Sequence, residues 1–199
     1  MTLPLAPARM SDSPVTVFEH IVEQRRSVYC YLPDPVPRAI VEGALKLAML
    51  APNHHRTRPW RFFVYADGGR EPLAIAYQAA AQRLGRDVAK ARERALEAPV
   101  MIVVACVPAS ANPRVKVWEE EFATAAATQT MLLALASAGV GSLIGTGDLA
   151  MSDEVRVLVG LQDPAARVMA VVSVGYQDTR RPLVPRTEPD LSAFTQWST

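Results

Sequence analysis

The residues best suited to bind a small anion are Arg25, Arg26 and Ser27, which stand together at the expected end of the first helix. Guanidinium groups bind phosphate through paired, charge-assisted hydrogen bonds, and a serine hydroxyl supplies a further donor. The same triplet fits a plainer interpretation, in which cations at a helix end interact with the helix dipole. The triplet alone does not separate these two interpretations, so the rest of the sequence has to be weighed with it.

Two other motifs resemble cofactor or metal sites, and their context argues against both. Residues 145–150 match the G-x-G-x-x-A dinucleotide pattern, but too little chain follows for a Rossmann half, so we interpret them as a turn with closely approaching backbone. His54 and His55 are adjacent, His20 is the other histidine, and there is no HExxH motif. We therefore expect no metal site.

Hydrophobic periodicity and capping residues outline the elements that must position these groups. We expect helices over residues 14–24, 37–50, 71–97, 117–138 and 152–161, with Ser13 and Ser152 as N-caps. We expect strands over residues 60–66, 100–107, 142–144 and 167–175. The pattern predicts a single α+β domain over residues 14–199, preceded by a flexible leader over residues 1–13.

Composition limits the classes of function. The chain has 199 residues, 50% of them hydrophobic, and its 21 Lys+Arg nearly balance 20 Asp+Glu, so we expect no nucleic-acid partner. No run of residues is apolar enough to span a membrane, and the N-terminus lacks the apolar core of a signal peptide. Cys30 and Cys106 form no disulfide framework, which favours a cytoplasmic location.

The C-terminal tail is the last feature that the residues themselves single out. Leu191, Phe194 and Trp197 lie in a proline-rich segment that cannot form a core of its own. Large apolar side chains of this kind need a surface to pack on. That surface belongs either to the tail's own domain or to a second copy of the chain.

The segment between the second helix and the first strand gives the clearest family signal. Residues 51–64 read APNHHRTRPWRFFV, in which a helix ends in Ala-Pro and Pro-Trp-x-Phe opens a strand. With the Arg-Arg-Ser triplet about 25 residues upstream, this resembles the nitroreductase family of FMN-dependent oxidoreductases. Further matches follow in order, and they are Ala98-Pro99-Val100, residues 118–122, residues 139–142 and Val174-Gly175-Tyr176. The resemblance covers residues 15–194 and is closest to the short, single-domain bacterial branch.

The resemblance implies a fold and a set of cofactor contacts. The fold would be nitroreductase-like, with a central mixed or antiparallel sheet of about four to five strands flanked by helices, and a tail extending to the partner subunit of a homodimer. FMN would lie at the subunit interface. Its contacts would be Arg25, Arg26, Ser27, Leu50, His54, Ile144, Gly145, Thr146 and Arg186. Arg180 and Arg181 compete with Arg186 for the phosphate.

One departure from the family pattern concerns the acceptor. Relatives usually carry glutamine immediately before the Pro-Trp pair and often asparagine two residues earlier, whereas this chain has Arg58 and Arg56. A cation there could stabilise an anionic reduced flavin, point to solvent, or face an acidic substrate. The sequence leaves all three roles open.

The activity implied by the resemblance is ping-pong hydride transfer through flavin N5. NAD(P)H would reduce the FMN, and a nitroaromatic, quinone or related electrophile would then accept the electrons. No side chain is needed as acid or base, since the flavin does the chemistry. The alternatives are specialised flavin chemistry, such as dehalogenation or enone reduction, and a non-catalytic flavin-binding redox sensor or store. The sequence does not choose between NADH and NADPH.

Overall fold

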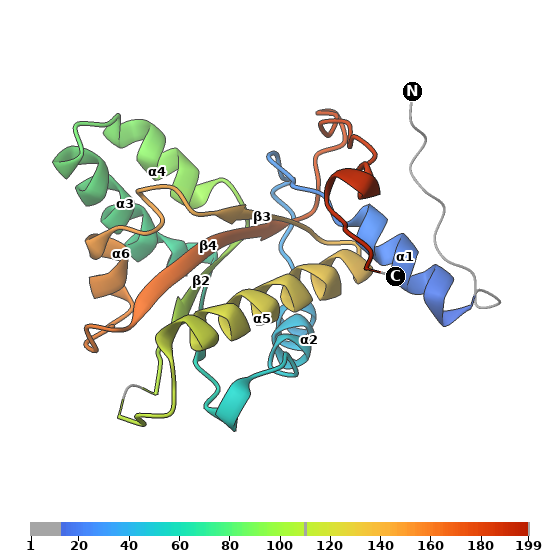
Figure 1. Cartoon of the computed structure of the whole chain (residues 1–199). Coiled ribbons are helices and arrows are strands. Elements are labelled where there is room, and N and C mark those ends of the chain that lie inside the picture. The colour runs from blue at the N-terminus through green and yellow to red at the C-terminus, as the bar shows by residue number, and fades with distance from the viewer. Residues whose placement is uncertain (1–12, 110, 199) are drawn as a thin grey trace.

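The computed structural model describes residues 13–109 and 111–198 (Figure 1). Its centre is an antiparallel sheet of four strands in the order β1-β2-β4-β3. The strands are β1 (Trp60–Ala66), β2 (Val100–Cys106), β3 (Gly141–Gly145) and β4 (Arg167–Gly175). The predicted α+β class and the flanked sheet are therefore confirmed, and the sheet is antiparallel rather than mixed.

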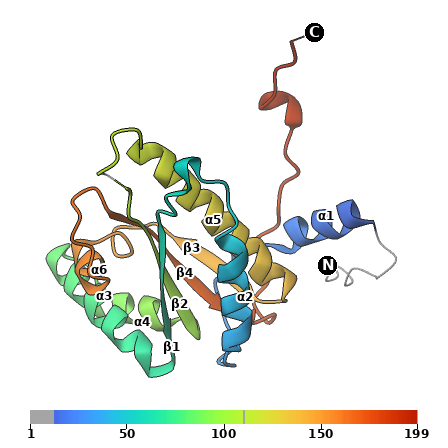
Figure 2. The same ribbon diagram turned by 90° about the horizontal axis from the view of Figure 1, so that it is seen from below.

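Helices cover both faces of the sheet because its central strands are apolar on both sides. Val100, Ile102 and Val104 of β2 pack into a core shared with α2 (Arg38–Ala48) and α5 (Val117–Ser137). Met101 and Val103 point the other way. They pack with α3 (Glu71–Arg83), α4 (Val88–Leu96) and α6 (Asp153–Leu158). Figures 1 and 2 show these two groups of helices on opposite sides of the sheet. A continuous apolar run is typical of a strand buried on both faces.

The helix α1 (Pro14–Gln24) begins where the sequence predicts. Ser13 is the N-cap, and its hydroxyl accepts a hydrogen bond of 3.2 Å from the backbone N–H of Thr16. None of the helix's residues is buried within this chain. Val15, Phe18 and Val22 are exposed large apolar side chains of its sequence, so the described residues leave much of the apolar face of this amphipathic helix uncovered. Of the predicted leader, residues 1–12 lie outside the described residues.

The prediction of continuous helix over residues 71–97 is wrong. The segment forms two helices, α3 and α4, because Gly85 adopts a left-handed conformation with φ of +65° after α3 ends. Asp87 then starts α4, and its carboxylate accepts a hydrogen bond of 3.0 Å from the N–H of Lys90. Glycine followed by an N-capping aspartate is a stop and start signal.

Three short 3₁₀ turns complete the described elements, namely η1 (His54–Arg56), η2 (Asp67–Arg70) and η3 (Leu191–Ala193). The tail that carries η3 leaves the body of the domain (Figure 2). Its Phe194 and Trp197 side chains are 84% and 81% exposed. The alternative in which the tail packs onto its own domain is therefore not what the structure shows.

Two kinds of feature are absent from the described residues. No helix among them is both long and apolar enough to cross a membrane. Over residues 13–109 and 111–198, no cluster of three or more His, Cys, Asp or Glu side chains could hold a metal ion.

Candidate functional site

The Arg25-Arg26-Ser27 triplet lies between α1 and the edge strand β3. Arg25 caps α1 with an extended conformation, and its N–H donates to the carbonyl of Ile21 at 3.0 Å. Ser27 then forms a parallel bridge with Ser142 of β3. The next N–H, that of Val28, donates to the Ser142 carbonyl at 3.1 Å. The backbone of the triplet is thus fixed to the sheet edge, which holds the two guanidinium groups beside it.

The segment between β4 and η3 passes this triplet and adds a third cation. Arg186 donates from Nη2 to the carbonyl oxygen of Arg25 at 2.8 Å and from Nη1 to that of Val22 at 3.4 Å. In the opposite direction, Arg26 donates to the carbonyl oxygen of Val184. Residues more than 150 positions apart in the sequence are therefore joined at the end of α1.

Positive charge gathers at this place, and no carboxylate of the described part of the chain pairs with it. Partial burial lowers the pKa of Arg25, and repulsion from Arg186 and Arg26 lowers it further. Among residues 13–109 and 111–198, none of these three arginines forms an ion pair with an acidic side chain. An uncompensated group of guanidinium ions favours binding of an anion, and phosphate matches the geometry of the guanidinium fork.

Of the other two tail arginines, Arg180 has a side-chain partner of its own. Arg180 makes a bidentate ion pair with Asp178, with Nε–Oδ1 and Nη2–Oδ2 distances of 2.9 and 2.8 Å. Hydrogen bonds from Arg180 lower the pKa of Asp178, and the charge of Arg181 adds to that effect. Arg186 is therefore the tail arginine that the fold brings to the triplet.

Ile144, Gly145 and Thr146 lie along the same edge of the sheet. Ile144 and Gly145 pair with Val172 and Val171 of β4, and Ile144 is partly exposed. A Cβ on Gly145 would come within 3.1 Å of the Val171 carbonyl oxygen, so this position leaves little room for a side chain. Ser142 precedes Ile144 by two residues, or roughly 7 Å along a strand. The arginine cluster and this segment thus belong to one surface.

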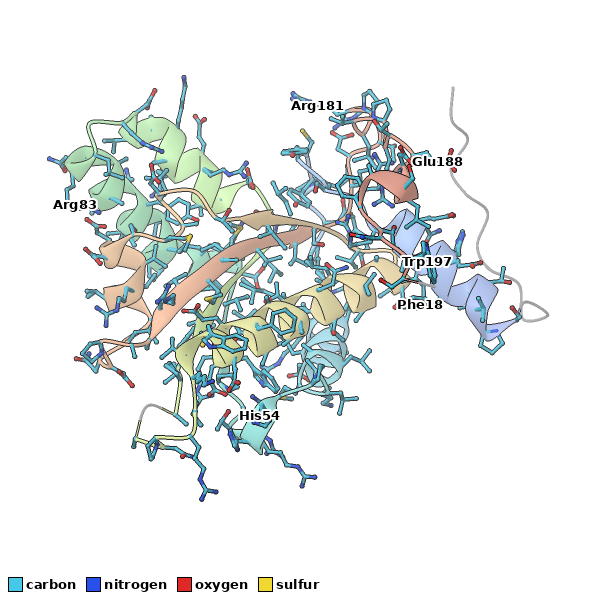
Figure 3. The ribbon with its side chains drawn as sticks, in the orientation of Figure 1. Phe18, His54, Arg83, Arg181, Glu188 and Trp197 are labelled. Carbon is cyan, nitrogen blue, oxygen red and sulfur yellow. The ribbon has the colours of Figure 1, made fainter. Side chains whose placement is uncertain are left out.

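Leu50 and His54 lie elsewhere in the chain. Leu50 follows α2 and is 78% exposed, and His54 begins η1. Their loop is fixed at the first turns of α5, where Asn53 donates to Glu120 at 3.2 Å. The triplet lies at the other end of α5, a 21-residue helix roughly 30 Å long. Figure 3 accordingly shows His54 and the tail on opposite sides of α5. A single chain does not bring these two sets of predicted residues together.

Sequence reasoning missed the role of Glu120. Its carboxylate is 1% exposed and accepts hydrogen bonds from the Asn53 amide, the Thr57 hydroxyl and the N–H of Ala109. From the sequence alone, the favourable effect of carboxylates on a helix N-terminus is a sufficient explanation for this acid. The helical register could have indicated that Glu120 is buried, since it precedes the buried Ala123 and Thr124 by three and four residues and lies on the same face of the helix.

A hollow lies where this loop meets α5. It has a volume of about 400 Å³. Its lining residues are Pro52, Asn53, His54, Trp118, Glu119, Phe122 and Ala123. Trp118 and Phe122 are one turn apart on α5, and both are largely exposed. An aromatic wall beside a polar loop suits a planar organic molecule.

The fold and the arginine cluster define an α+β domain with a candidate anion site, and comparison with known proteins identifies its family. The model of the Nitroreductase family matches residues 22–176. The chain therefore belongs to the Nitroreductase family, which confirms the resemblance found in the sequence.

Three related proteins illustrate the range of similarity. The Bacillus subtilis protein named "Putative NAD(P)H nitroreductase YfhC" is 28% identical over 187 residues, covering 91% of this chain and 94% of that protein. Rat iodotyrosine deiodinase 1 is 27% identical over 199 residues, covering 89% of this chain and 66% of that protein. The solved structure of the FMN-dependent nitroreductase NfnB from Mycobacterium smegmatis, in complex with NADPH, superposes with a TM-score of 0.74 at 19% identity, covering 94% and 100% of the two chains.

Proposed function

We propose that this protein is an FMN-dependent oxidoreductase that takes electrons from NAD(P)H and passes them to nitroaromatic, quinone or related electrophilic acceptors. The observation that carries the proposal is the cluster of Arg25, Arg26 and Arg186 beside Ser27, with no carboxylate paired to it among the described residues. Family membership supplies the class of chemistry, and FMN and NADPH are named for the structural relative NfnB.

The described residues fit FMN better than a flavin dinucleotide. Three guanidinium groups and the Ser27 hydroxyl suit a terminal phosphate. The strand β3 is an edge strand of the sheet, so the side of Ile144 and Gly145 that faces away from β4 is where a flat ring would approach. When bound, the flavin supplies hydride transfer at N5. The chain's own residues bind the phosphate, orient the ring and limit access of water.

The proposal includes a homodimer. Leu50 and His54 are held at the opposite end of α5 from the arginine cluster, so they reach a flavin only as residues of another copy. In the dimer, His54 of the partner subunit would complete the site formed by Arg25 and Arg186. The exposed apolar side chains of α1 and of the tail, Phe18 and Phe194 among them, supply the surface that a second copy would cover.

The proposed function is tested on the purified full-length protein. Flavin released by denaturation is identified by chromatography, and the holoprotein is then reduced anaerobically with NADH and with NADPH. We expect stoichiometric FMN, bleaching by at least one nucleotide, and reoxidation by nitroaromatics or quinones. Recovery of FAD, or of no flavin even after reconstitution, contradicts the proposal. A yellow dimer that neither nucleotide bleaches identifies a flavin-binding sensor or store instead.

Reductive dehalogenation is a second candidate function. Its support is the similarity to rat iodotyrosine deiodinase 1, which extends over 89% of this chain. The same reduced holoprotein distinguishes the two candidates, because iodide release from 3-iodotyrosine that outpaces reduction of every nitroaromatic and quinone in the panel favours dehalogenation.

We also propose a cytoplasmic location. Cys30 and Cys106 are free thiols, as expected in a reducing compartment. Fractionation of the source cells followed by immunodetection tests this directly.

A further inference from the structure

The loop that joins α2 to β1 has an unusual backbone. His55, Arg56 and Arg58 have φ values of 61°, 55° and 54°, in the left-handed region that residues other than glycine rarely adopt. Two of these three residues are arginines. Strained conformations persist only where the surrounding structure imposes them, and they gather at functional sites.

A dense set of hydrogen bonds imposes this conformation. Asn53 accepts at Oδ1 from the N–H of Arg58 at 2.7 Å and from the Thr57 hydroxyl at 3.2 Å. The buried Glu120 carboxylate in turn accepts from Asn53 and Thr57. On the outer side, Arg61 donates from Nη1 to the Arg58 carbonyl at 2.8 Å. The loop is therefore held from inside and outside in one conformation.

This rigid loop carries two cations that no carboxylate of the described residues pairs with. Arg56 and Arg58 are exposed, and neither forms an ion pair with a carboxylate in residues 13–109 or 111–198. The whole chain has a formal net charge of only +1, so the positive charge here is local. Exposed arginines on a flexible loop carry little information about function. Arginines on a rigid backbone lose less conformational freedom when they bind an anion, so they suit anion recognition.

The neighbouring hollow supplies the complementary apolar surface. Trp118 and Phe122 line it together with His54 from the same loop. The carboxylate among its lining residues is Glu119, at the loop's side of α5. Arg56 and Arg58 are not among the lining residues, but they follow His54 by two and four residues in the same loop. A planar aromatic molecule on the aromatic wall could therefore extend an anionic substituent toward these cations.

We infer that the electron acceptors of this protein are aromatic compounds that carry a carboxylate or a similar anionic group. Arg56 and Arg58 would bind the anion, while Trp118 and Phe122 would pack against the ring. The inference rests on the proposed function, since the hollow adjoins His54, which is proposed to reach the flavin of the partner subunit. Glu120 is a positioning residue in this scheme, because it acts on the acceptor only through the loop.

The test compares a charged acceptor with a neutral one of the same shape. The holoprotein is first reduced, and its reoxidation by 4-nitrobenzoate and by 4-nitrobenzamide is followed separately by stopped flow. The key variant is Arg56→Asn/Arg58→Asn, because asparagine tolerates the left-handed region, so the cations are removed without new backbone strain. Arg56→Lys/Arg58→Lys keeps the charge, and Arg38→Gln removes an exposed arginine at the far end of α2.

We expect the ratio of second-order rate constants, charged over neutral acceptor, to fall about tenfold in the Asn double variant. The Lys double variant should keep most of the selectivity, and Arg38→Gln should keep all of it. An unchanged ratio in the Asn double variant would overturn the inference. An equal loss for both acceptors with a shifted flavin reduction potential would also overturn it, because the cations would then act on the reduced flavin. So would a slower reduction by NADPH alone, which would assign the cations to a nucleotide phosphate.

A binding measurement separates this inference from the proposed function. Benzoate, which is not reduced, is titrated into the oxidised holoprotein by calorimetry. Binding that weakens about tenfold in the Asn double variant supports the anion site even if no acceptor is turned over. If benzoate does not bind to the unmodified protein, or binds equally to the unmodified protein and the Asn double variant, the inferred anion site is overturned.

Discussion

Arg186 donates a hydrogen bond of 2.8 Å to the backbone carbonyl oxygen of Arg25, although 161 positions separate the two residues in the sequence. The bond neutralises no charge, since its acceptor is a peptide oxygen. It brings a cation from the tail to a cation at the end of α1, and the pKa of Arg25 falls partly because of that proximity. Two like charges held together in this way are stabilised by a bound anion.

Replacement of either arginine should weaken FMN binding. Loss of a charge-assisted contact to phosphate costs about 1.5–3 kcal/mol, so Arg25→Ala and Arg186→Ala should each lower FMN affinity roughly 10- to 150-fold. Titration of the apoprotein with FMN measures the effect. Arg180→Ala is the matched control, because Arg180 pairs with Asp178 instead. Unchanged affinity with slightly lower thermal stability would mean that Arg25 acts only as a helix-end cation.

Deletion of residues 188–199 should weaken the proposed dimer. Leu191, Phe194 and Trp197 are exposed in the single chain, and burial of each against a partner is worth roughly 1.5–3 kcal/mol. We expect a higher dissociation constant for the truncated dimer, or aggregation, together with lower flavin content. Light scattering and flavin absorbance over a concentration series provide the measurement. A dimer of unchanged affinity with full FMN occupancy would show that the tail has no role in assembly.

The substitution Glu120→Gln should destabilise the fold and loosen the loop. The buried carboxylate accepts from three donors, whereas a glutamine side chain has one accepting oxygen and leaves a donor facing its amide group. We expect a loss of about 1–3 kcal/mol in the free energy of unfolding, and faster hydrogen exchange at the Arg58 N–H. Glu119→Gln is the neighbouring control. Equal stability of the two variants would contradict the assigned role.

The substitution Gly141→Ala should lower both the free energy of unfolding and the FMN content. A Cβ at Gly141 would lie 2.7 Å from Cγ2 of Val28, the residue directly after the triplet, and Val28 is itself buried. Overpacking of this kind costs roughly 1–3 kcal/mol, and displacement of Val28 should reduce FMN content. Gly147→Ala is the control, since nothing lies within 4 Å of its Cβ position. Urea unfolding measures the stability of both variants, and flavin absorbance measures their FMN content. Equal stability and equal FMN content of the two variants would refute the predicted clash with Val28.

The Arg83–Glu154 ion pair should contribute to stability in a pH-dependent way. Hydrogen bonds from Arg83 lower the pKa of Glu154 from 4.5 to about 2. The unfolded chain therefore binds a proton that the folded chain does not, so the contribution is present above pH 4.5 and is lost as the pH falls toward 2.

A double-mutant cycle measures this contribution. Exposed pairs contribute about 0.2–1 kcal/mol, so the coupling energy from Arg83→Gln and Glu154→Gln should lie in that range at pH 7. It should shrink between pH 5 and the acid unfolding transition. A coupling energy that stays constant or grows as the pH falls would show that this ion pair makes no pH-dependent contribution to the free energy of unfolding.

Much of the secondary structure follows from local sequence signals. Ser13 and Ser152 cap their helices as expected, and the strands Trp60–Ala66 and Arg167–Gly175 have the predicted bounds. Caps, prolines and apolar alternation act within a few residues, so a single sequence contains them in full. The break at Gly85 is of the same local kind, and the charge-rich helical pattern on both sides obscured it.

The composition of the candidate site depended on contacts between distant residues. The sequence by itself determined the family, the order of the helices and strands, and the presence of an Arg-Arg-Ser triplet at the end of α1. Only the tertiary structure decided that Arg186 rather than Arg180 meets the triplet, that Glu120 is buried beneath the loop, and that Arg56 and Arg58 are fixed in left-handed conformations. The physical reason is that equivalent side chains have equal local propensities, so which of them pair is decided by the packing that folding brings about.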